Sequence, residues 1–413
     1  MQKILSIFGT RPEAIKMAPL VQALALEPGI QSVVCVTGQH KTMLQQVLDL
    51  FGIVPQHDLA LMTENQTLNA LTARLITSID AVIEQERPDR ILVHGDTTTA
   101  SAAALAAFHR RVPIGHVEAG LRTRDMQQPW PEEMNRRLVD VVSDLMFAPT
   151  AGSKANLDAE CLQGRVIITG NNVIDALVAM AARIDGDSGL RHALDARFPF
   201  IDASKKMVLV TGHRRESFGQ GFADICSALA QLASRPDTQV VYPVHLNPNV
   251  SGPVKETLGK LPNVHLIEPQ DYLGFIRLLQ RSSVVLTDSG GVQEEAPALG
   301  KPVLVMRRVT ERPEAIEAGT AQLVGTDPAA IVAAVNALLD DAQARAAFEN
   351  RVNPYGDGQA SARIAAALAG RPVHEFSPAS QSVATLSAAR LSLSDSANLA
   401  HAVAHHAPFE VRS

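Results

Sequence analysis

The chain has 413 residues, of which 46% are hydrophobic and 19% are charged, and its formal net charge is −6. This balance gives no basic face for a nucleic acid, and no apolar run approaches the ~20 residues of a membrane span. Three widely spaced cysteines and an N-terminal apolar stretch too short for a signal peptide predict a reduced, cytoplasmic protein without disulfides or a metal site.

Short apolar runs rich in β-branched residues alternate with helical stretches along most of the chain. Because these runs are continuously apolar, we expect strands that are buried on both faces, as in parallel α/β sheets. The first series of predicted strands is Lys3–Phe8, Ser32–Thr37, Arg90–His94, Ile114–Val117, Asp144–Phe147 and Val166–Thr169. The second series is Met207–Thr211, Gln239–Val244, Val264–Glu268, Val284–Thr287, Pro302–Met306 and Ala321–Val324.

Two series of strands predict two doubly wound, Rossmann-like α/β domains, with ligands bound at the carboxyl ends of the strands. In a two-domain arrangement these ends can face each other across a cleft. We expect an N-terminal domain over residues 1–172 and a C-terminal domain over 173–358, joined within Gly170–Ser204. Residues 371–413 are rich in Ala, Ser and His towards their end, and we expect a flexible tail there.

The stretch from Val284 to Met306 predicts a buried strand, a Ser289-Gly290-Gly291 turn, a helix and another buried strand. Bare backbone N–H groups and a hydroxyl at a helix N-terminus favour a phosphate or a diphosphate. Glu294 and Glu295 follow about one turn later and could accept hydrogen bonds from a ribose diol. A turn that merely reverses the chain is the alternative.

Basic and acidic residues follow several predicted strands. Arg11 and Lys16, after the first strand, could reach a phosphate, or could be a solvated pair at a helix start. Asp96 directly follows the third strand, where an ordinary helix N-cap is the alternative. Glu118 ends an apolar strand. Helix capping explains a charged residue at that position less well. Glu132 could be an ordinary acid of a first helical turn.

His213 follows a strand and a glycine turn in the second half, where it could act as an acid or bind phosphate. The chain has no G-x-G-x-x-G after the first strand, no P-loop and no clustered Cys/His set. Together, the carboxylates, the histidine and the predicted diphosphate turn indicate a nucleotide-sugar enzyme that uses acid–base catalysis, without metal or redox cofactor.

In this order, the motifs closely resemble the non-hydrolysing UDP-N-acetylglucosamine 2-epimerases of bacteria, over roughly residues 1–370. The matching segments are Gly9–Glu13, Thr37–His40, Val93–Thr99, Gly115–Thr123, Pro129–Glu133, Val210–Ser217, Pro243–Pro248, Thr287–Pro302, Thr310–Glu314 and Asn353–Gly358. The resemblance implies a glycosyltransferase-B type fold, with a terminal helix near residues 359–368 that packs back on the first domain.

The resemblance further implies reversible conversion of UDP-GlcNAc to UDP-ManNAc, by elimination of UDP to a 2-acetamidoglucal and re-addition. It implies no cofactor, a homodimer and a supply of ManNAc units to bacterial surface polysaccharide. By matching motif, Asp96, Glu118 and Glu132 would be the acid–base carboxylates, and His213 would assist the departing diphosphate.

By the same matching, a larger set of residues would contact the UDP-sugar, and a second set would form an activating UDP-GlcNAc site beside it. The first set is Arg11, Lys16, Asp96, Glu118, His213, Gln270, Phe275, Ser289, Gly290, Gly291, Glu295 and Arg312. The second set is Gln39, His40, Gln66, Arg214 and His245.

Three other functions compete with this interpretation. A hydrolysing relative would release ManNAc and UDP, and a glycosyltransferase of the same fold would require an acceptor. A nucleotide-sugar-binding regulator would lack catalysis and would tolerate loss of Glu118.

Overall fold

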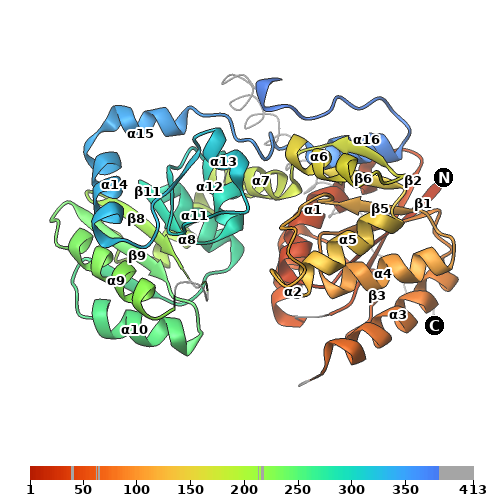
Figure 1. Ribbon diagram of the computed structural model, residues 1–413, viewed down its shortest axis with the longest axis horizontal. Coiled ribbons are helices and arrows are strands. Elements are labelled where there is room, and N and C mark those ends of the chain that lie inside the picture. The colour runs from red at the N-terminus through yellow and green to blue at the C-terminus, as the bar shows by residue number, and fades with distance from the viewer. Residues whose placement is uncertain (39–40, 62, 64–65, 213, 215–217, 381–413) are drawn as a thin grey trace. The chain divides into compact units, whose positions relative to one another are not determined.

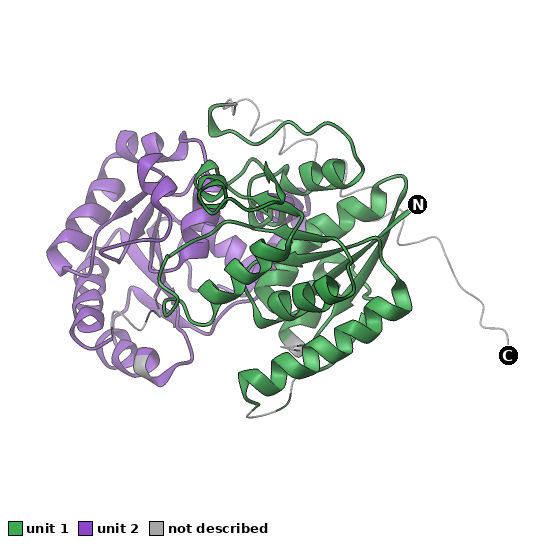
Figure 2. Ribbon diagram, turned by 45° about the vertical axis from the view of Figure 1, so that its right-hand side comes forward, with its two compact units in different colours: residues 1–176, 355–380 green, residues 177–354, 381–413 purple. Residues whose placement is uncertain are grey.

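The computed structural model describes residues 1–38, 41–61, 63, 66–212, 214 and 218–380 (Figure 1). They form two compact units: unit 1 contains residues 1–176 and 355–380, and unit 2 contains residues 177–354 (Figure 2). The chain leaves unit 1 within helix α7 (Asn172–Gly186), and these division points lie a few residues from the predicted domain limits.

Unit 1 contains a seven-stranded parallel sheet in the order β3-β2-β1-β4-β5-β6-β7. Its strands are β1 (Gln2–Phe8), β2 (Ile30–Val36), β3 (His57–Asp58), β4 (Arg90–His94), β5 (Ile114–Val117), β6 (Leu145–Ala148) and β7 (Arg165–Ile168). Besides the start of α7, its helices are α1 (Arg11–Leu26), α2 (Lys41–Phe51), α3 (Leu68–Glu86), α4 (Thr98–His109), α5 (Glu132–Val142), α6 (Ala151–Ala159), α16 (Ala360–Leu368) and the 3₁₀ turn Pro378–Ser380.

Unit 2 contains a six-stranded parallel sheet in the order β10-β9-β8-β11-β12-β13. Its strands are β8 (Lys206–Thr211), β9 (Thr238–Pro243), β10 (Val264–Ile267), β11 (Val284–Thr287), β12 (Val303–Val305) and β13 (Ala321–Leu323). Besides the rest of α7, its helices are α8 (Ser188–Ala196), α9 (Gln220–Ala233), α10 (Pro248–Leu258), α11 (Tyr272–Arg281), α12 (Gly290–Ala298), α13 (Pro313–Glu317), α14 (Pro328–Asp340) and α15 (Ala342–Glu349).

The prediction of two doubly wound α/β sheets is confirmed, and each predicted strand is present within one or two residues. The central strands are buried on both faces: the adjacent residues Ile4 and Leu5 in β1, and Val208 and Leu209 in β8, have no exposed surface. Burial of apolar area, worth roughly 25 cal/mol per Å², therefore fixes these strands. Strand β3 was not predicted, because its two residues, His57 and Asp58, contain no apolar run.

The strand order reverses next to β1 in unit 1 and next to β8 in unit 2. Strand β1 lies between β2 and β4, and β8 lies between β9 and β11. At such switch points the connections leave in opposite directions and open a crevice at the carboxyl ends of the strands. The loops after β1 and β4, and after β8 and β11, are therefore the expected ligand-binding loops.

The chain returns to unit 1 through α16, which packs against α1. The Asp175 carboxylate accepts hydrogen bonds from the N–H groups of Ala360 (3.2 Å) and Ser361 (2.7 Å), at the start of α16. Beyond the helix, Phe376 is buried, and its N–H donates to the Ile168 carbonyl at 2.8 Å. Flexibility of the tail stays a prediction, since residues 381–413 lie outside the described part.

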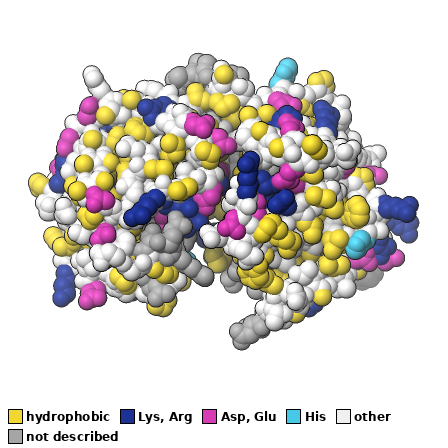
Figure 3. Space-filling view, in the orientation of Figure 1, with side chains coloured by type: hydrophobic (Ala, Val, Ile, Leu, Met, Phe, Trp, Pro, Cys, Tyr) yellow, Lys and Arg dark blue, Asp and Glu magenta, His cyan; other side chains and the backbone are white. Residues whose placement is uncertain are grey.

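No helix in the described part of the chain is long and apolar enough to cross a membrane. On the face shown in Figure 3, acidic and basic side chains are interspersed over both units.

Candidate active site

The carboxyl edge of the unit 1 sheet brings several of the predicted residues to the ends of neighbouring strands. Arg11 begins α1 shortly after β1, Asp96 lies two residues beyond β4, and Glu118 directly follows β5. Glu132 is the first residue of α5, the helix that follows β5. This edge is therefore the candidate for acid–base chemistry.

Glu118 has a strained backbone and a largely buried carboxylate. Its φ of 68° is left-handed, which costs a residue with a side chain roughly 1–2 kcal/mol. Its side chain is 8% exposed, and its Oε1 lies 2.5 Å from Lys16 Nζ and 2.7 Å from Asn171 Nδ2. Strain of this kind persists where the surroundings over-determine a conformation, often at functional sites. The structure thus brings together Lys16 and Glu118, both predicted site residues.

His94, the last residue of β4, lies on the other side of the same carboxylate. Its Nε2 is buried without a hydrogen-bond partner among the described residues and lies 3.7 Å from Glu118 Oε2. Burial lowers the pKa of His94 to about 3, although the charge of Glu118 opposes this shift. Glu118 is consequently flanked by a cation on one side and a neutral imidazole on the other.

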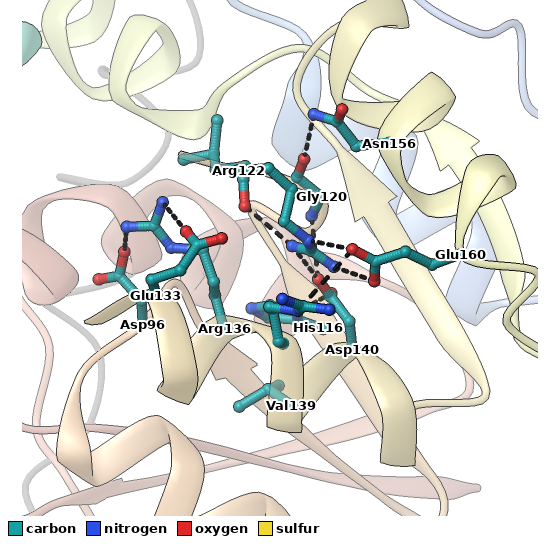
Figure 4. Close-up of polar contacts among 12 residues, drawn as sticks. Asp96, His116, Gly120, Arg122, Glu133, Arg136, Val139, Asp140, Asn156 and Glu160 are labelled. Carbon is teal, nitrogen blue, oxygen red and sulfur yellow. Dashed lines mark hydrogen bonds and ion pairs between the residues drawn. The ribbon is translucent and has the colours of Figure 1, made fainter. Parts of the chain in front are cut away.

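Asp96 is held by α5 rather than by another predicted residue (Figure 4). Arg136 donates to Asp96 Oδ2, and Asn135 Nδ2 donates to the Asp96 carbonyl at 2.9 Å. The N-cap alternative for Asp96 is wrong, because Thr97 is the cap of α4 and accepts a hydrogen bond from the Ala100 N–H. The Asp96 side chain, which is 27% exposed, therefore lies beside the Arg136 guanidinium.

Glu132 differs from an ordinary first-turn acid in its surroundings. Its Oε2 is buried and has no hydrogen-bond partner among the described residues. Buried carboxylate oxygens are normally satisfied, so an orphan oxygen calls for a ligand, a water molecule or a catalytic role. Its neighbour Glu133 is structural: it accepts hydrogen bonds from the N–H groups of Thr123 and Arg124 at 3.0 and 3.1 Å.

The loop that carries Arg11 is fixed by a capping box. Thr10 caps α1, and Glu13 accepts from the N–H groups of Gly9 (3.1 Å) and Thr10 (2.7 Å). The other oxygen of Glu13 accepts from the Thr97 hydroxyl at 2.7 Å, which ties the loop after β1 to the loop after β4. Burial raises the pKa of Glu13. Both loops at the switch point are thus locked to each other.

In unit 2, the turn after β11 forms an anion cradle at the start of α12. Ser289 is the N-cap, but its hydroxyl makes no capping hydrogen bond, and Gly290 and Gly291 begin the helix. A Cβ placed on Gly290 would lie 3.8 Å from Arg312 Nη2 and 3.9 Å from Arg214 Nη2. Two guanidinium groups and a helix N-terminus beside bare backbone suit a diphosphate well.

Acidic partners hold both guanidinium groups at this turn. Arg312 Nε donates to Glu294, which is 2% exposed, and Arg214 Nη1 lies 3.5 Å from Glu311 Oε1. The Arg214 N–H also donates to Asp288 Oδ2 at 2.8 Å. Arg214, which matched the activating site, therefore lies at the predicted substrate turn.

The remaining unit 2 residues lie on or near two helices. Phe275 lies half-buried in the first turn of α11, and Glu295 lies half-buried in α12. Gln270, just before α11, donates to the Glu268 carbonyl at 2.6 Å and accepts from Arg197 at 3.0 Å. Their predicted contacts with a nucleotide stay predictions.

The predicted activating residues are divided between the units. Gln66, in unit 1, accepts from Arg74 and from the Thr63 hydroxyl, whereas His245, in unit 2, is exposed and accepts from the Asn247 N–H at 3.1 Å. Gln39, His40 and the candidate catalytic His213 lie outside the described residues. Within the described part, no group of three His, Cys, Asp or Glu residues could hold a metal ion.

Sequence reasoning missed His94, Asn171 and Arg136. His94 and Asn171 each end or follow a strand of the same sheet, so their position in the chain was an available signal. Arg136 lies one helical turn after Glu132 in a segment with several charges, where nothing local distinguishes it.

Comparison with known proteins gives a consistent result. A family model described as UDP-N-acetylglucosamine 2-epimerase matches residues 22–369. The chain is 55% identical over 368 residues to the UDP-N-acetylglucosamine 2-epimerase of Salmonella typhimurium, covering 89% of this chain and 98% of that protein.

Two solved structures share the fold along most of the chain. The Neisseria meningitidis UDP-GlcNAc 2-epimerase bound to UDP-GlcNAc is 48% identical with a TM-score of 0.84, covering 90% of this chain and 100% of that one. The Methanocaldococcus jannaschii UDP-GlcNAc 2-epimerase in complex with UDP-GlcNAc and UDP is 31% identical with a TM-score of 0.74, covering 89% and 100%. The expected glycosyltransferase-B type fold class is confirmed.

Proposed function

We propose that this chain, which belongs to the UDP-N-acetylglucosamine 2-epimerase family, interconverts UDP-GlcNAc and UDP-ManNAc without hydrolysis to a free sugar. The observation that carries the proposal is the group of three carboxylates at one sheet edge. Glu118 is strained and paired, Asp96 is paired with Arg136, and Glu132 has a buried oxygen without a partner among the described residues.

The substrate's chemistry explains why several carboxylates are needed. The C2 hydrogen of the sugar has no adjacent carbonyl, so a side-chain base cannot remove it to leave a discrete carbanion. If the C1–O bond breaks as the proton leaves, its electrons go to the diphosphate oxygen and a C1=C2 double bond forms. The product, 2-acetamidoglucal, regains UDP at C1 and a proton on the opposite face of C2. One carboxylate takes a proton while another gives one.

We assign different parts of this chemistry to the two units. Unit 1 supplies the carboxylates for proton transfer at C2. Unit 2 supplies the turn of Ser289, Gly290 and Gly291, with Arg312 and Arg214 beside it, to stabilise the diphosphate charge when C1–O breaks. We assign Glu295 to the ribose diol, and Gln270 and Phe275 to the nucleotide. His213 is proposed to assist the departing diphosphate, and Arg11 to contact it.

We further propose that UDP-GlcNAc activates the enzyme at a second site that includes Gln66, His245 and Arg214. Because Arg214 lies beside Gly290, an effector there would share a cation with the substrate's diphosphate turn. A sigmoidal dependence of rate on UDP-GlcNAc is expected. Hyperbolic kinetics with one nucleotide bound per chain would contradict it.

We also propose a homodimer in the cytoplasm that supplies ManNAc units for bacterial surface polysaccharide. All three cysteines are free, with Cys35 and Cys226 buried, which suits a reducing compartment. Sedimentation equilibrium tests the dimer, and a single species of monomer mass would reject it.

Incubation with UDP-GlcNAc in D₂O, followed by NMR, tests the reaction itself. We expect UDP-ManNAc that carries deuterium at C2, because the group that re-protonates the glycal is not the one that took the C2 proton, and its exchangeable proton is deuterium in D₂O. Free ManNAc with UDP would indicate the hydrolysing alternative. Unchanged UDP-GlcNAc would leave a glycosyltransferase or a non-catalytic regulator.

A further inference from the structure

Helix α5 contributes more to the candidate site than Glu132. Its residues Asn135 and Arg136 hold Asp96, and Asp140, two turns after Glu132, is completely buried. Asp140 Oδ1 lies 2.6 Å from Nδ1 of His116, which is also completely buried and projects from β5 (Figure 4). Neither the proposed acid–base chemistry nor substrate binding uses this pair.

Two polar contacts fix the orientation of the His116 ring. Its Nε2 lies 2.8 Å from the Gly95 carbonyl, which can only accept, so Nε2 must carry a hydrogen. Burial alone would raise the pKa of Asp140, but His116 and Arg122 together hold it below its usual range. Both ring nitrogens of His116 are thus held, one by the Gly95 carbonyl and the other by the Asp140 carboxyl group.

The other oxygen of Asp140 holds the turn that follows Glu118. Asp140 Oδ2 lies 2.7 Å from Arg122 Nη1 and accepts from the Gly120 N–H at 3.3 Å. Arg122 is in turn held by both oxygens of Glu160, at 2.8 Å each. The turn from Glu118 to Arg122 is thus attached to α5 through one carboxylate.

The contact with the Gly95 carbonyl brings the His116–Asp140 pair close to Asp96 and Glu118. Gly95 precedes Asp96 and has a left-handed φ of 62°, and a Cβ there would lie 3.3 Å from Glu118 Oε2. The peptide that leads into Asp96 therefore has little room against Glu118. His116 sets where that peptide lies, and Asp140 links it to the helix that carries Glu132.

We propose that the buried His116–Asp140 pair is a positioning device that holds Asp96, Glu118 and Glu132 at fixed separations. It joins the end of β4, the end of β5 and helix α5 at one point. Because both side chains are fully buried, the pair acts through the residues it holds and not on substrate. The inference rests on the proposed acid–base function of these three carboxylates.

The chain offers a matched control at the opposite end of the same strands. Asp144 accepts from Arg90, at the start of β4, at 2.6 and 2.8 Å, and from the Ile114 N–H, at the start of β5, at 2.9 Å. Asp144 therefore links the amino ends of β4 and β5 as Asp140 links their carboxyl ends. A substitution there disturbs the sheet without touching the candidate site.

The test compares Asp140→Asn with Asp144→Asn, with thermal unfolding of each variant measured separately. Misplacement of catalytic groups by about 1 Å can cost on the order of 10²-fold in rate. We expect Asp140→Asn to lower kcat by about tenfold or more with KM within about twofold, and Asp144→Asn to leave kcat within about twofold. UDP binding, measured by calorimetry, should be unchanged in both.

A second variant covers the case in which Asp140→Asn does not fold. His116→Gln leaves the Asp140–Arg122 ion pair in place and should lower kcat in the same way. In the double variant the losses should be strongly non-additive, because both act through one contact. Equal kcat values in Asp140→Asn, His116→Gln and Asp144→Asn would overturn the proposal.

The wild-type protein separates failure of this inference from failure of the proposed function. If wild type incorporates deuterium at C2 but Asp140→Asn and His116→Gln keep full kcat, only the positioning role is rejected. If wild type does not epimerise, the proposed function is rejected together with the positioning role that depends on it.

Discussion

The carboxyl edge of unit 1 and the Ser289–Gly291 turn of unit 2 both lie at the carboxyl ends of strands in a parallel sheet with a switch point. They differ in which chemical groups carry the charge. In unit 1 the charged atoms are side-chain carboxylates, and side chains from α5 and α1 fix them. In unit 2 the positive field comes from backbone N–H groups and from two arginines that acidic neighbours hold. In the proposed reaction, proton transfer requires groups that titrate, whereas a departing diphosphate requires a fixed positive field.

The largest effect is expected from Glu118→Gln, which removes the carboxylate but keeps its shape. Loss of an acid–base group typically costs 10²–10⁴-fold, so kcat should fall by on the order of 10²-fold or more while UDP still binds. The measurement is the initial rate of UDP-ManNAc formation by NMR. Glu86→Gln is the control. Like Glu118, Glu86 pairs with a lysine, in this case Lys3 at 3.0 Å, but it lies at the end of α3. Similar rates in both variants would remove Glu118 from the chemistry.

The next largest effect is expected at the Ser289–Gly291 turn of unit 2. Arg312→Ala should weaken UDP binding by about tenfold or more, because hydrogen bonds to a charged group contribute roughly 1.5–3 kcal/mol. Calorimetric titration with UDP measures it. Arg277→Ala is the control in the same unit, since Arg277 makes two 2.8 Å contacts with Asp195. If both variants bound UDP equally well, the α12 turn would not be the diphosphate site.

A smaller effect is expected from Gly95→Ala, compared with Gly52→Ala. Both glycines have left-handed φ values, 62° and 65°, so each substitution should destabilise the fold by roughly 1–2 kcal/mol. A Cβ at Gly95 would lie 3.3 Å from Glu118 Oε2, whereas a Cβ at Gly52 would meet nothing within 4 Å. Only Gly95→Ala should therefore lower kcat, by about tenfold. Urea unfolding and initial rates together decide this, and matching kcat values would show that Glu118 tolerates displacement.

The smallest effect on catalysis is expected outside both edges, at the contact of Asp175 with the start of α16. Burial raises the pKa of Asp175 to about 6, against an ordinary value of 3.8. Its contribution to stability is present below pH 3.8 and is lost as pH rises through about 6, because the folded protein then holds a buried charge. The free energy of unfolding should fall by roughly 3 kcal/mol across this window.

Asp175→Asn should remove that pH dependence without changing kcat. Thermal unfolding of both proteins between about pH 4 and pH 7 measures it. Asp187→Asn serves as a control, because Asp187 caps α8 in unit 2. If wild type and Asp175→Asn showed the same pH slope, Asp175 would not be the titrating group.

Much of the fold could be predicted because its strands are short apolar runs that are buried on both faces. Strand β4 (Arg90–His94) and strand β11 (Val284–Thr287) have the predicted bounds. Strand β3 was missed because an edge strand of two polar residues has no such pattern. The order of the strands, and with it the switch points, depends on pairings between residues far apart in the chain.

Of the candidate site, the sequence alone determined which polar residues end strands and where a glycine turn opens a helix. It did not determine what holds them, because these contacts join distant segments: Lys16 to Glu118, Arg136 to Asp96, and His116 to Asp140. Local sequence patterns indicate secondary-structure propensity and the periodicity of buried residues. The partner of a buried charged side chain depends instead on which strands become neighbours. Only the tertiary structure decided that α5 holds Asp96 and the turn after Glu118, and that two arginines lie beside the turn of Gly290.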